Sequence, residues 1–421
     1  MGPVFFPLDE ELGLLAGGLT PRLYEQLVRL GTWIPSFEQA AEMLADFTDG
    51  SRVDEATARR DTEKAGAAYV EIQEHEVERL EKELPPAVQG PAKLVLSADG
   101  AMVPLVGGEW AEVKTAVIGE PEPGMGEKGE TVVHLHNLSY FSRLTDSNTF
   151  QRLALVETHR RGVETAGQVS APADGSEWIQ TFVDFHRPDA VRILDFPHAG
   201  EHINAIGQIV LGEGSPAARA WLGTQLHNLK HTGPTSLLAE IGDMAQERPA
   251  EEDLQEHVAY LKKREPHMQY PQFQADGWPI GSGATESANK LVVEARLKGS
   301  GMHWARPHVD PMLVLRNIVC SDRWNEAWPH IEQALRHQDK QQRAEHRQKR
   351  RAKCTRMPTP MPTETRPAPP IPPETVSAPI IPEKSSAPVA ASALPKPAEP
   401  RRPPADHIWR RSPIGKARYW R

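Results

Sequence analysis

The arrangement of apolar residues between positions 93 and 194 constrains the fold of this chain more than any other part of the sequence. Five short segments have the apolar spacing of β-strands: 93–97, 113–118, 132–138, 167–171 and 191–194. Two segments between them have the spacing of amphipathic helices: 148–161 and 178–185. The order predicts a mixed α/β sheet, in which hairpins join the first three strands and helices lead to two further parallel strands.

This order of elements is the layout of a ribonuclease-H-like domain, and the rest of the chain divides around it. Four parts are predicted: a helical N-terminal module (1–88), the ribonuclease-H-like domain (89–198 and 277–335), a helical insertion (199–276) and a basic, Pro-rich, mostly disordered tail (336–421). The insertion is too long for a simple crossover between two elements. The tail is expected to be extended and disordered because sixteen of the 39 prolines lie between Pro358 and Pro404.

Charge and cysteine content exclude several classes of protein. The formal net charge of −9 argues against indiscriminate binding of nucleic acid. Two cysteines, Cys320 and Cys354, are too few for a disulfide scaffold or for a zinc site made of cysteines of this chain. No apolar run approaches the roughly 20 residues of a membrane span, and no signal peptide opens the sequence. We therefore expect a cytoplasmic protein without a membrane partner.

The N-terminal module contains a segment, at about 36–68, with the pattern of a helix-turn-helix. Ser36 begins a capping box, a Gly-containing turn at 48–51 follows, and the second helix carries Arg59 and Arg60. Exposed arginines on the second helix of such a pair predict contact with DNA. Many helical hairpins have the same pattern without binding DNA, so both interpretations stay open.

Three acidic residues are candidates for a metal-dependent site. Asp99 ends the first strand and Asp174 ends the fourth, and these strands lie side by side in the predicted sheet. Glu286 lies in the first turn of a later helix, for which Thr285 is the predicted N-cap. Three converging carboxylates repel one another unless cations lie between them, which predicts a site for two Mg²⁺ ions. The competing interpretation is that each Asp-Gly pair is only a hairpin turn.

A competing candidate for the second acid is Asp195, which closes the fifth strand in the segment LDFPHAGEH. An aspartate followed three residues later by a histidine, here His198, can ligate a metal, position a phosphate or fix the next helix by hydrogen bonds. We favour a supporting role for this pair, because the order of strands places Asp174, and not Asp195, beside Asp99.

The helix that carries Glu286 continues into a basic and aromatic run. Four of its side chains are predicted to hold a DNA strand: Lys290, Arg296, Lys298 and Trp304. The predicted apolar face of the helix follows from the spacing of four residues: Ala288, Leu291, Val292 and Ala295. The alternative is a solvated amphipathic helix whose cations only face water.

Short motifs are spread over nearly the whole chain outside the Pro-rich stretch: PLDEELGL, SADGAMVPL, ADGSEWI, ILDFPHAGEH, YPQFQADGWPIGSGATES and RLKGSGMHW. The motif around Glu286 is the most specific of them. They resemble the motifs of bacterial insertion-sequence transposases of the ISKra group, which have a DDE-type active site. The resemblance implies metal-dependent DNA strand cleavage and strand transfer. Asp99, Asp174 and Glu286 would be the catalytic acids and metal ligands, and Asp195 with His198 would match an accessory signature.

The resemblance also implies cofactors, partners and a location. We expect Mg²⁺, with Mn²⁺ as a substitute, and the element's ends and target DNA as partners of a homodimer or larger assembly in the bacterial nucleoid. Family members usually begin with a Cys-rich segment before the PLDE motif, whereas this chain starts at MGPVFFPLDE, which indicates an N-terminally shortened copy or a misplaced start. Two alternative functions stay open: an inactive remnant that only binds DNA, and a ribonuclease-H-like nuclease without strand transfer.

Overall fold

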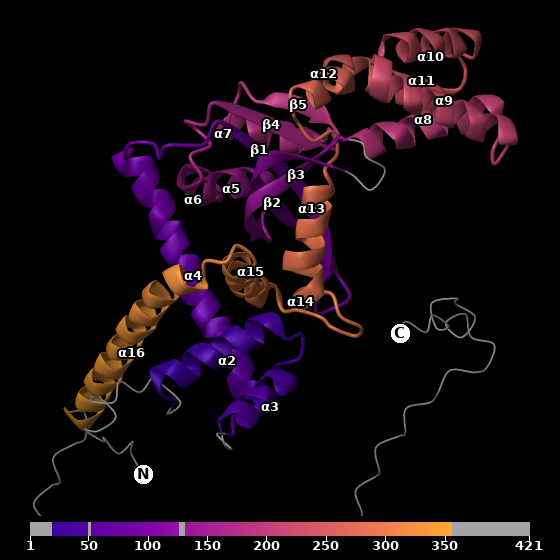
Figure 1. Cartoon of the computed structure of the whole chain (residues 1–421). Coiled ribbons are helices and arrows are strands. Elements are labelled where there is room, and N and C mark those ends of the chain that lie inside the picture. The colour runs from indigo at the N-terminus through magenta and orange to yellow at the C-terminus, as the bar shows by residue number, and fades with distance from the viewer. Residues whose placement is uncertain (1–18, 49–51, 126–130, 356–421) are drawn as a thin grey trace, which may run out of the picture. The chain divides into compact units, whose positions relative to one another are not determined.

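A computed structural model describes residues 19–48, 52–125 and 131–355 of the chain (Figure 1). The protein is α/β, with one mixed five-stranded sheet among many helices: β1 (Lys93–Pro104), β2 (Trp110–Met125), β3 (Thr131–Arg143), β4 (Gln168–Ala173) and β5 (Val191–Leu194). The strand order is β3-β2-β1-β4-β5. Strands β1, β2 and β3 pair antiparallel, whereas β4 and β5 add in parallel. The predicted mixed sheet and the pairing of the first with the fourth strand are therefore confirmed.

Strand β1 does not end at Asp99, and the predicted turn at the Asp-Gly pair is wrong. Asp99 pairs with Thr115 of β2 in the middle of the antiparallel ladder. The hairpin closes later, where the amide of Leu105 donates to the carbonyl of Glu109 at 2.7 Å. Gly107 and Gly108 supply the turn with φ angles of +98° and +84°, which residues with a side chain rarely adopt.

Alternation along β1 sends successive side chains to opposite faces of the sheet. Leu94, Leu96 and Ala98 pack with Phe150 and other residues of one core cluster. Odd-numbered residues face the other side. There Ala101 and Val103 pack against the helical segment that carries Glu286: α13 (Gly283–Ala288), the π-helical η2 (Asn289–Glu294) and α14 (Ala295–Leu297). Asp99 has the same parity, so its carboxyl lies on the face that this segment covers.

Three helices connect the strands: α5 (Ser147–Leu153), α6 (Leu155–Arg160) and α7 (Glu177–His186). The predicted helix at 148–161 is thus divided at Ala154, which is both the C-cap of α5 and the N-cap of α6. Phe150 and Phe182 bring α5 and α7 together over the sheet, with ring centroids 5.4 Å apart. This layer covers the face of the sheet opposite to Asp99.

The N-terminal module consists of three helices: α2 (Pro21–Trp33), α3 (Phe37–Phe47) and α4 (Glu55–Glu83). Ser36 caps α3 by accepting from the amide of Gln39 at 3.3 Å, and Asp54 caps α4 by accepting from that of Thr57 at 2.6 Å. The predicted turn at 48–51 lies largely outside the described residues. Helix α4 continues through the strongly acidic residues 69–83, where Gln73, Val77 and Leu80 extend its buried face.

Helix α4 packs against two C-terminal helices, α15 (Arg306–Cys320) and α16 (Trp324–Thr355). At Gly66 the two backbones approach so closely that a Cβ atom would lie 2.6 Å from the carbonyl carbon of Pro311. Helix α16 extends to Thr355, so the predicted disordered tail does not begin at 336. The remainder of that predicted tail lies outside the described residues.

The predicted insertion is helical, as expected, and begins directly after β5. It comprises five α-helices and one 3₁₀ turn: α8 (Phe196–Leu211), α9 (Pro216–Thr232), α10 (Thr235–Glu247), α11 (Glu252–Lys263), η1 (Glu265–Met268) and α12 (Tyr270–Ala275). Its own apolar core includes Ile203, Leu229 and Leu237, and Ile193 and Leu194 of β5 belong to the same core cluster. Figure 1 shows these helices extending from the sheet. No helix in the described ranges is at once long and apolar enough to cross a membrane.

Candidate active site

Asp99 is the centre of the candidate site. Its carboxylate accepts two hydrogen bonds, from the amide of Gly100 at 2.7 Å and from the side-chain nitrogen of Asn289 at 2.9 Å. Burial raises the pKa of Asp99 above its usual range, and the negative charges of Asp174 and Glu286 raise it further, whereas the two hydrogen bonds oppose this increase. Asp174 and Glu286 are therefore both close enough to act electrostatically on Asp99.

Asp174 reaches the site from the strand next to β1. It follows directly after β4, and its side chain accepts from the amide of Ser176 at 2.8 Å, which begins the turn into α7. Its own backbone carbonyl accepts from the hydroxyl of Tyr260 in the insertion. Asp174 thus lies at the carboxyl end of a parallel strand, where the chain leaves the sheet.

Glu286 lies in the first turn of α13, as predicted, but Thr285 is not its N-cap. The helix begins after Ser282, and Thr285 is fully buried, with its hydroxyl 2.7 Å from the carbonyl oxygen of Ser282 and 3.2 Å from the hydroxyl of Ser97. Glu286 is exposed, and its carboxylate lies 3.8 Å from the ammonium of Lys290. Thr285 fastens α13 to β1 and leaves Glu286 at the surface of the site.

The predicted apolar face of this helical segment is only half right, because residues 289–294 form a π-helix. Ala288 and Val292 are buried as expected, whereas Leu291 and Ala295 are exposed. The π-helical turn has a longer period than the α-helix, so it rotates the following residues and buries Val293 and Leu297 instead. The guanidinium of Arg316 donates to the backbone carbonyls of Leu291 and Val292 within this turn.

Two of the four residues expected to hold DNA are inside the protein. Arg296 is 1% exposed, lies over the rings of Phe37 and Trp304, and donates to the carbonyl oxygen of Gly31 at 3.0 Å. Trp304 is 6% exposed, and its ring nitrogen donates to the carbonyl oxygen of Leu297 at 3.1 Å. Their predicted place in an exposed, flexible run is therefore wrong: they connect the Glu286 segment to the N-terminal module.

The other predicted DNA-contacting cations are exposed. Lys290 lies near Glu286, and Lys298 forms an ion pair with Glu294 at 2.8 Å. Arg59 and Arg60 are exposed on α4. Exposed ion pairs of this kind contribute little to stability, so these side chains can exchange their partners for a phosphate at small cost.

Asp195 lies between the end of β5 and the start of α8. It is 5% exposed and caps α8, accepting from the amide of His198 at 3.0 Å. Its other oxygen accepts from the amide of Ser282 at 2.5 Å and so holds the residue that begins α13. The His198 ring lies 3.2 Å from the Glu201 carboxylate rather than on Asp195. Asp195 therefore links the end of β5 to the start of the Glu286 helix.

Sequence reasoning missed one residue of the site, Asn289. Asn289 lies three positions after Glu286, and residues at this spacing are neighbours on the surface of a helix. This spacing is the sequence signal that could have indicated Asn289. The side chain is 6% exposed, its nitrogen bonds Asp99, and its oxygen has no hydrogen-bond partner among the described residues.

The carboxylates do not form a closed metal site as they stand. Within the described parts of the chain, no three or more side chains of His, Cys, Asp or Glu are grouped closely enough to hold a metal ion. The donor chemistry of Asp99, Asp174 and Glu286 is nevertheless that of a Mg²⁺ site, all oxygen and all anionic. Of the three, Glu286 is the exposed side chain, so it is the one with room to turn.

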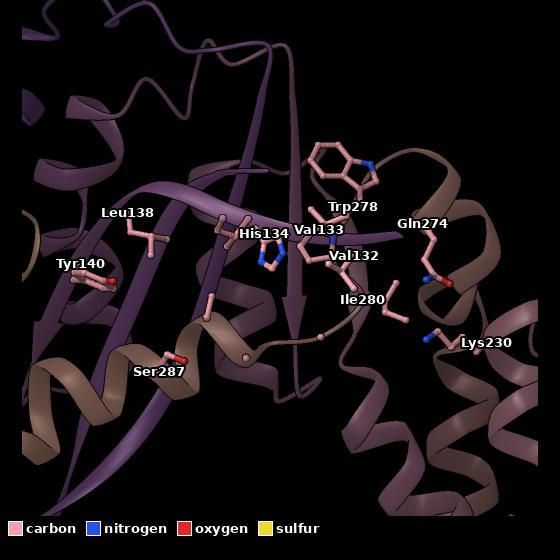
Figure 2. A pocket seen from close by; sticks show the side chains of 15 residues that line it. Val132, Val133, His134, Leu138, Tyr140, Lys230, Gln274, Trp278, Ile280 and Ser287 are labelled. Atoms are coloured by element: carbon pink, nitrogen blue, oxygen red, sulfur yellow. The ribbon is translucent and has the colours of Figure 1, made fainter. Parts of the chain in front are cut away.

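A cavity of about 550 Å³ lies beside α13. In Figure 2, Leu138 and Tyr140 project from β3, Ser287 from α13, and Lys230 and Gln274 from the insertion. Mostly apolar side chains line it, and Asp99, Asp174 and Glu286 are not among them.

Comparison with protein-family models and with curated proteins gives no match. What the site can do is therefore inferred from the chemistry and the placement of its residues.

Proposed function

We propose that this chain is a transposase that cuts DNA at the ends of an insertion sequence and transfers the cut strand to target DNA. The observation that carries the proposal is the convergence of three acids from distant parts of the chain. Asp99 comes from the central strand, Asp174 from the end of the neighbouring strand and Glu286 from a helix that lies across the same face. Burial raises the pKa of Asp99, and the charges of Asp174 and Glu286 add to that increase.

The order of the strands supports a ribonuclease-H-like fold for this domain. Three strands joined by hairpins, followed by parallel strands that are added through helices beside the first, make up that layout. The insertion between β5 and α13 explains why the third acid comes so late in the sequence. A fold alone does not define a reaction, so the acids and not the sheet carry the functional argument.

Three neighbouring carboxylates favour reaction with a phosphodiester only when their charge is compensated. Mg²⁺ ions, or Mn²⁺ in their place, would supply that compensation and would activate an attacking hydroxyl. Asp99 and Asp174 are held by hydrogen bonds to backbone amides. Among the described residues, the one ion pair of Glu286 is its long contact of 3.8 Å with Lys290, so cation binding would require this side chain to turn inward.

Exposed cations of the catalytic domain and of the N-terminal module support DNA as the substrate. Lys290 and Lys298 lie on the same segment as Glu286, and Arg59 and Arg60 lie on α4 of the N-terminal module. Phosphate contacts from such residues position a duplex without reading its sequence. The proposal includes a homodimer or larger assembly on the element's ends, in the bacterial cytoplasm and nucleoid.

The test is strand cleavage of a labelled duplex that contains the DNA flanking the coding sequence. Asp99→Asn keeps the shape of the side chain but removes its charge, and we expect it to abolish Mg²⁺-dependent cleavage and leave DNA binding largely intact. Asp322→Asn is the matched control, because Asp322 is exposed and its φ of +54° is one that asparagine tolerates. Cleavage that persists in the Asp99 variant refutes the assignment.

A second substrate separates strand transfer from hydrolysis. A duplex with a pre-cut 3′ end, incubated with target DNA, yields joined products with a transposase but not with a nuclease that only hydrolyses. Binding of the flanking DNA without any nicking in Mg²⁺ or Mn²⁺ would instead favour the inactive DNA-binding remnant.

A further inference from the structure

Two side chains of the insertion bond to the backbone of the turn that carries the second acid. The hydroxyl of Tyr260, on α11, donates to the carbonyl oxygen of Asp174. The guanidinium of Arg264, the residue that ends this helix, donates to the carbonyl oxygen of Gly175 at 2.7 Å. The two donors come from one turn of one helix and act on two successive carbonyl groups.

The ring of Tyr260 is itself held from both faces. The guanidinium carbon of Arg264 lies 3.6 Å from the ring centroid, and the ring of His202 stacks on it at 3.8 Å with an angle of 8° between the planes. His202 in turn lies 2.9 Å from His257, nitrogen to nitrogen. Burial, together with the charges of neighbouring His198, His257 and Arg264, lowers the pKa of His202 to about 4, so its ring is neutral at pH 7.

Gly175 allows this close approach. Its φ is +81°, and a Cβ atom there would lie 2.5 Å from Nε of Arg264 and 2.7 Å from the hydroxyl oxygen of Tyr260. A side chain at this position would therefore push the turn and the two donors apart. The glycine is needed both for the backbone conformation and for the space.

We propose that Tyr260 and Arg264 are positioning residues that brace the Asp174 turn against the helical insertion. The proposal rests on the proposed function in so far as Asp174 acts in DNA cleavage. Asp174 has left the strand ladder of β4, and its side chain is otherwise oriented by the amide of Ser176. A reactive carboxylate must be held within about 0.5 Å, and a displacement of about 1 Å can lower the rate about 100-fold.

The first readout is independent of activity. The amide of Ser176 bonds the carboxylate of Asp174, so its hydrogen exchange reports how firmly that carboxylate is held. Tyr260→Phe removes only the hydroxyl, and we expect exchange at residues 174–176 to become about tenfold faster. Tyr270→Phe is the matched control, since the hydroxyl of Tyr270 also donates to a backbone carbonyl, that of Leu194 at 2.9 Å, but not to this turn.

The second readout is strand cleavage by the full chain. We expect Tyr260→Phe to lower kcat about 10- to 100-fold while KM for DNA stays within about twofold, because the acid is displaced and the DNA-contacting surface is not. Thermal unfolding of both phenylalanine variants shows whether they are equally well folded. Unchanged exchange at residues 174–176 in Tyr260→Phe overturns the brace.

The remaining outcomes separate the brace from the proposed function. Faster exchange with an unchanged kcat refutes the catalytic importance of the brace, although the contact itself is real. Faster exchange in a protein whose unsubstituted form does not cut DNA refutes the proposed function, and with it the role in cleavage, but supports the structural brace. Gly175→Ala, which forces the donors away, should reproduce the exchange of Tyr260→Phe.

Discussion

The contact between α4 and α15 at Gly66 gives the sharpest prediction about stability. A Cβ atom at this position would lie 2.6 Å from the carbonyl carbon of Pro311 and 2.8 Å from its Cα, with the carbonyl oxygen closer still. All three atoms belong to the backbone of a helix, so none can rotate away. Relief of the overlap requires the helices to separate by about 1 Å, which forfeits about a quarter to a half of each dispersion contact across the interface.

We expect Gly66→Ala to destabilise the protein by about 2 kcal/mol. Overpacking of a well-filled interface costs about 3 kcal/mol at its upper range, and the higher helix propensity of alanine returns about 1 kcal/mol. Gly223→Ala is the matched control: Gly223 is an exposed residue of α9, and a Cβ atom there meets nothing within 4 Å. The same substitution should stabilise the protein by about 1 kcal/mol at that site.

Urea unfolding, followed by tryptophan fluorescence, measures both variants. Trp324 and Trp328 belong to the cluster in which α4 packs, so their emission reports on this interface. Hydrogen exchange in α4 shows whether the loss is local or global, which is necessary in a chain of this length. If Gly66→Ala is as stable as the unsubstituted protein, the close approach of the two helices is refuted.

Two further substitutions test buried ionisable groups. Arg296→Met should change stability by less than about 1 kcal/mol, because it removes a buried guanidinium whose two terminal nitrogens have no hydrogen-bond partner among the described residues. It should leave DNA affinity unchanged in a mobility-shift assay, whereas Lys298→Ala should weaken binding. A loss of DNA affinity in Arg296→Met as large as that in Lys298→Ala contradicts the burial of Arg296. Burial lowers the pKa of His186 from 6.5 to about 4, so the unfolded chain binds this proton more tightly and stability should fall by up to about 3 kcal/mol as the pH decreases from 6.5 to 4. His186→Phe should flatten the dependence of the urea midpoint on pH in this window, and an unchanged slope would contradict the shift.

Much of the sheet could be predicted because the apolar spacing within each segment was sufficient to identify it as a strand. The segment at 191–194 became β5 with the same bounds, and the order of elements was sufficient to place β4 beside β1. The prediction of a turn at residues 99–100 was wrong because Asp-Gly is frequent in hairpin turns. In this protein the strand continues through this pair to Pro104. The glycine at position 100 instead makes room for the side chain of Glu112 on the paired strand.

The details around the third acid depend on tertiary contacts that sequence spacing does not contain. Thr285 has the chemistry of an N-cap, but its hydroxyl is used inside the protein, against Ser97. A π-helical turn has no simple sequence signal, and it decided which apolar residues were buried. Arg296 was predicted to contact DNA because of its charge. Its guanidinium instead lies over the rings of Phe37 and Trp304 in the core.

The lateness of α13 in the chain has a consequence for biosynthesis. The last strand ends at residue 194 and this helix begins at residue 283, and the hydrogen bonds that dock it on β1 join residues 188 and 190 positions apart. Contacts that close such long loops form after local ones. A nascent chain can therefore complete its sheet, with Asp99 and Asp174 in place, while Glu286 has yet to be translated. On the proposed function, a ribosome-bound chain is unable to cut DNA until the insertion has been released and has folded.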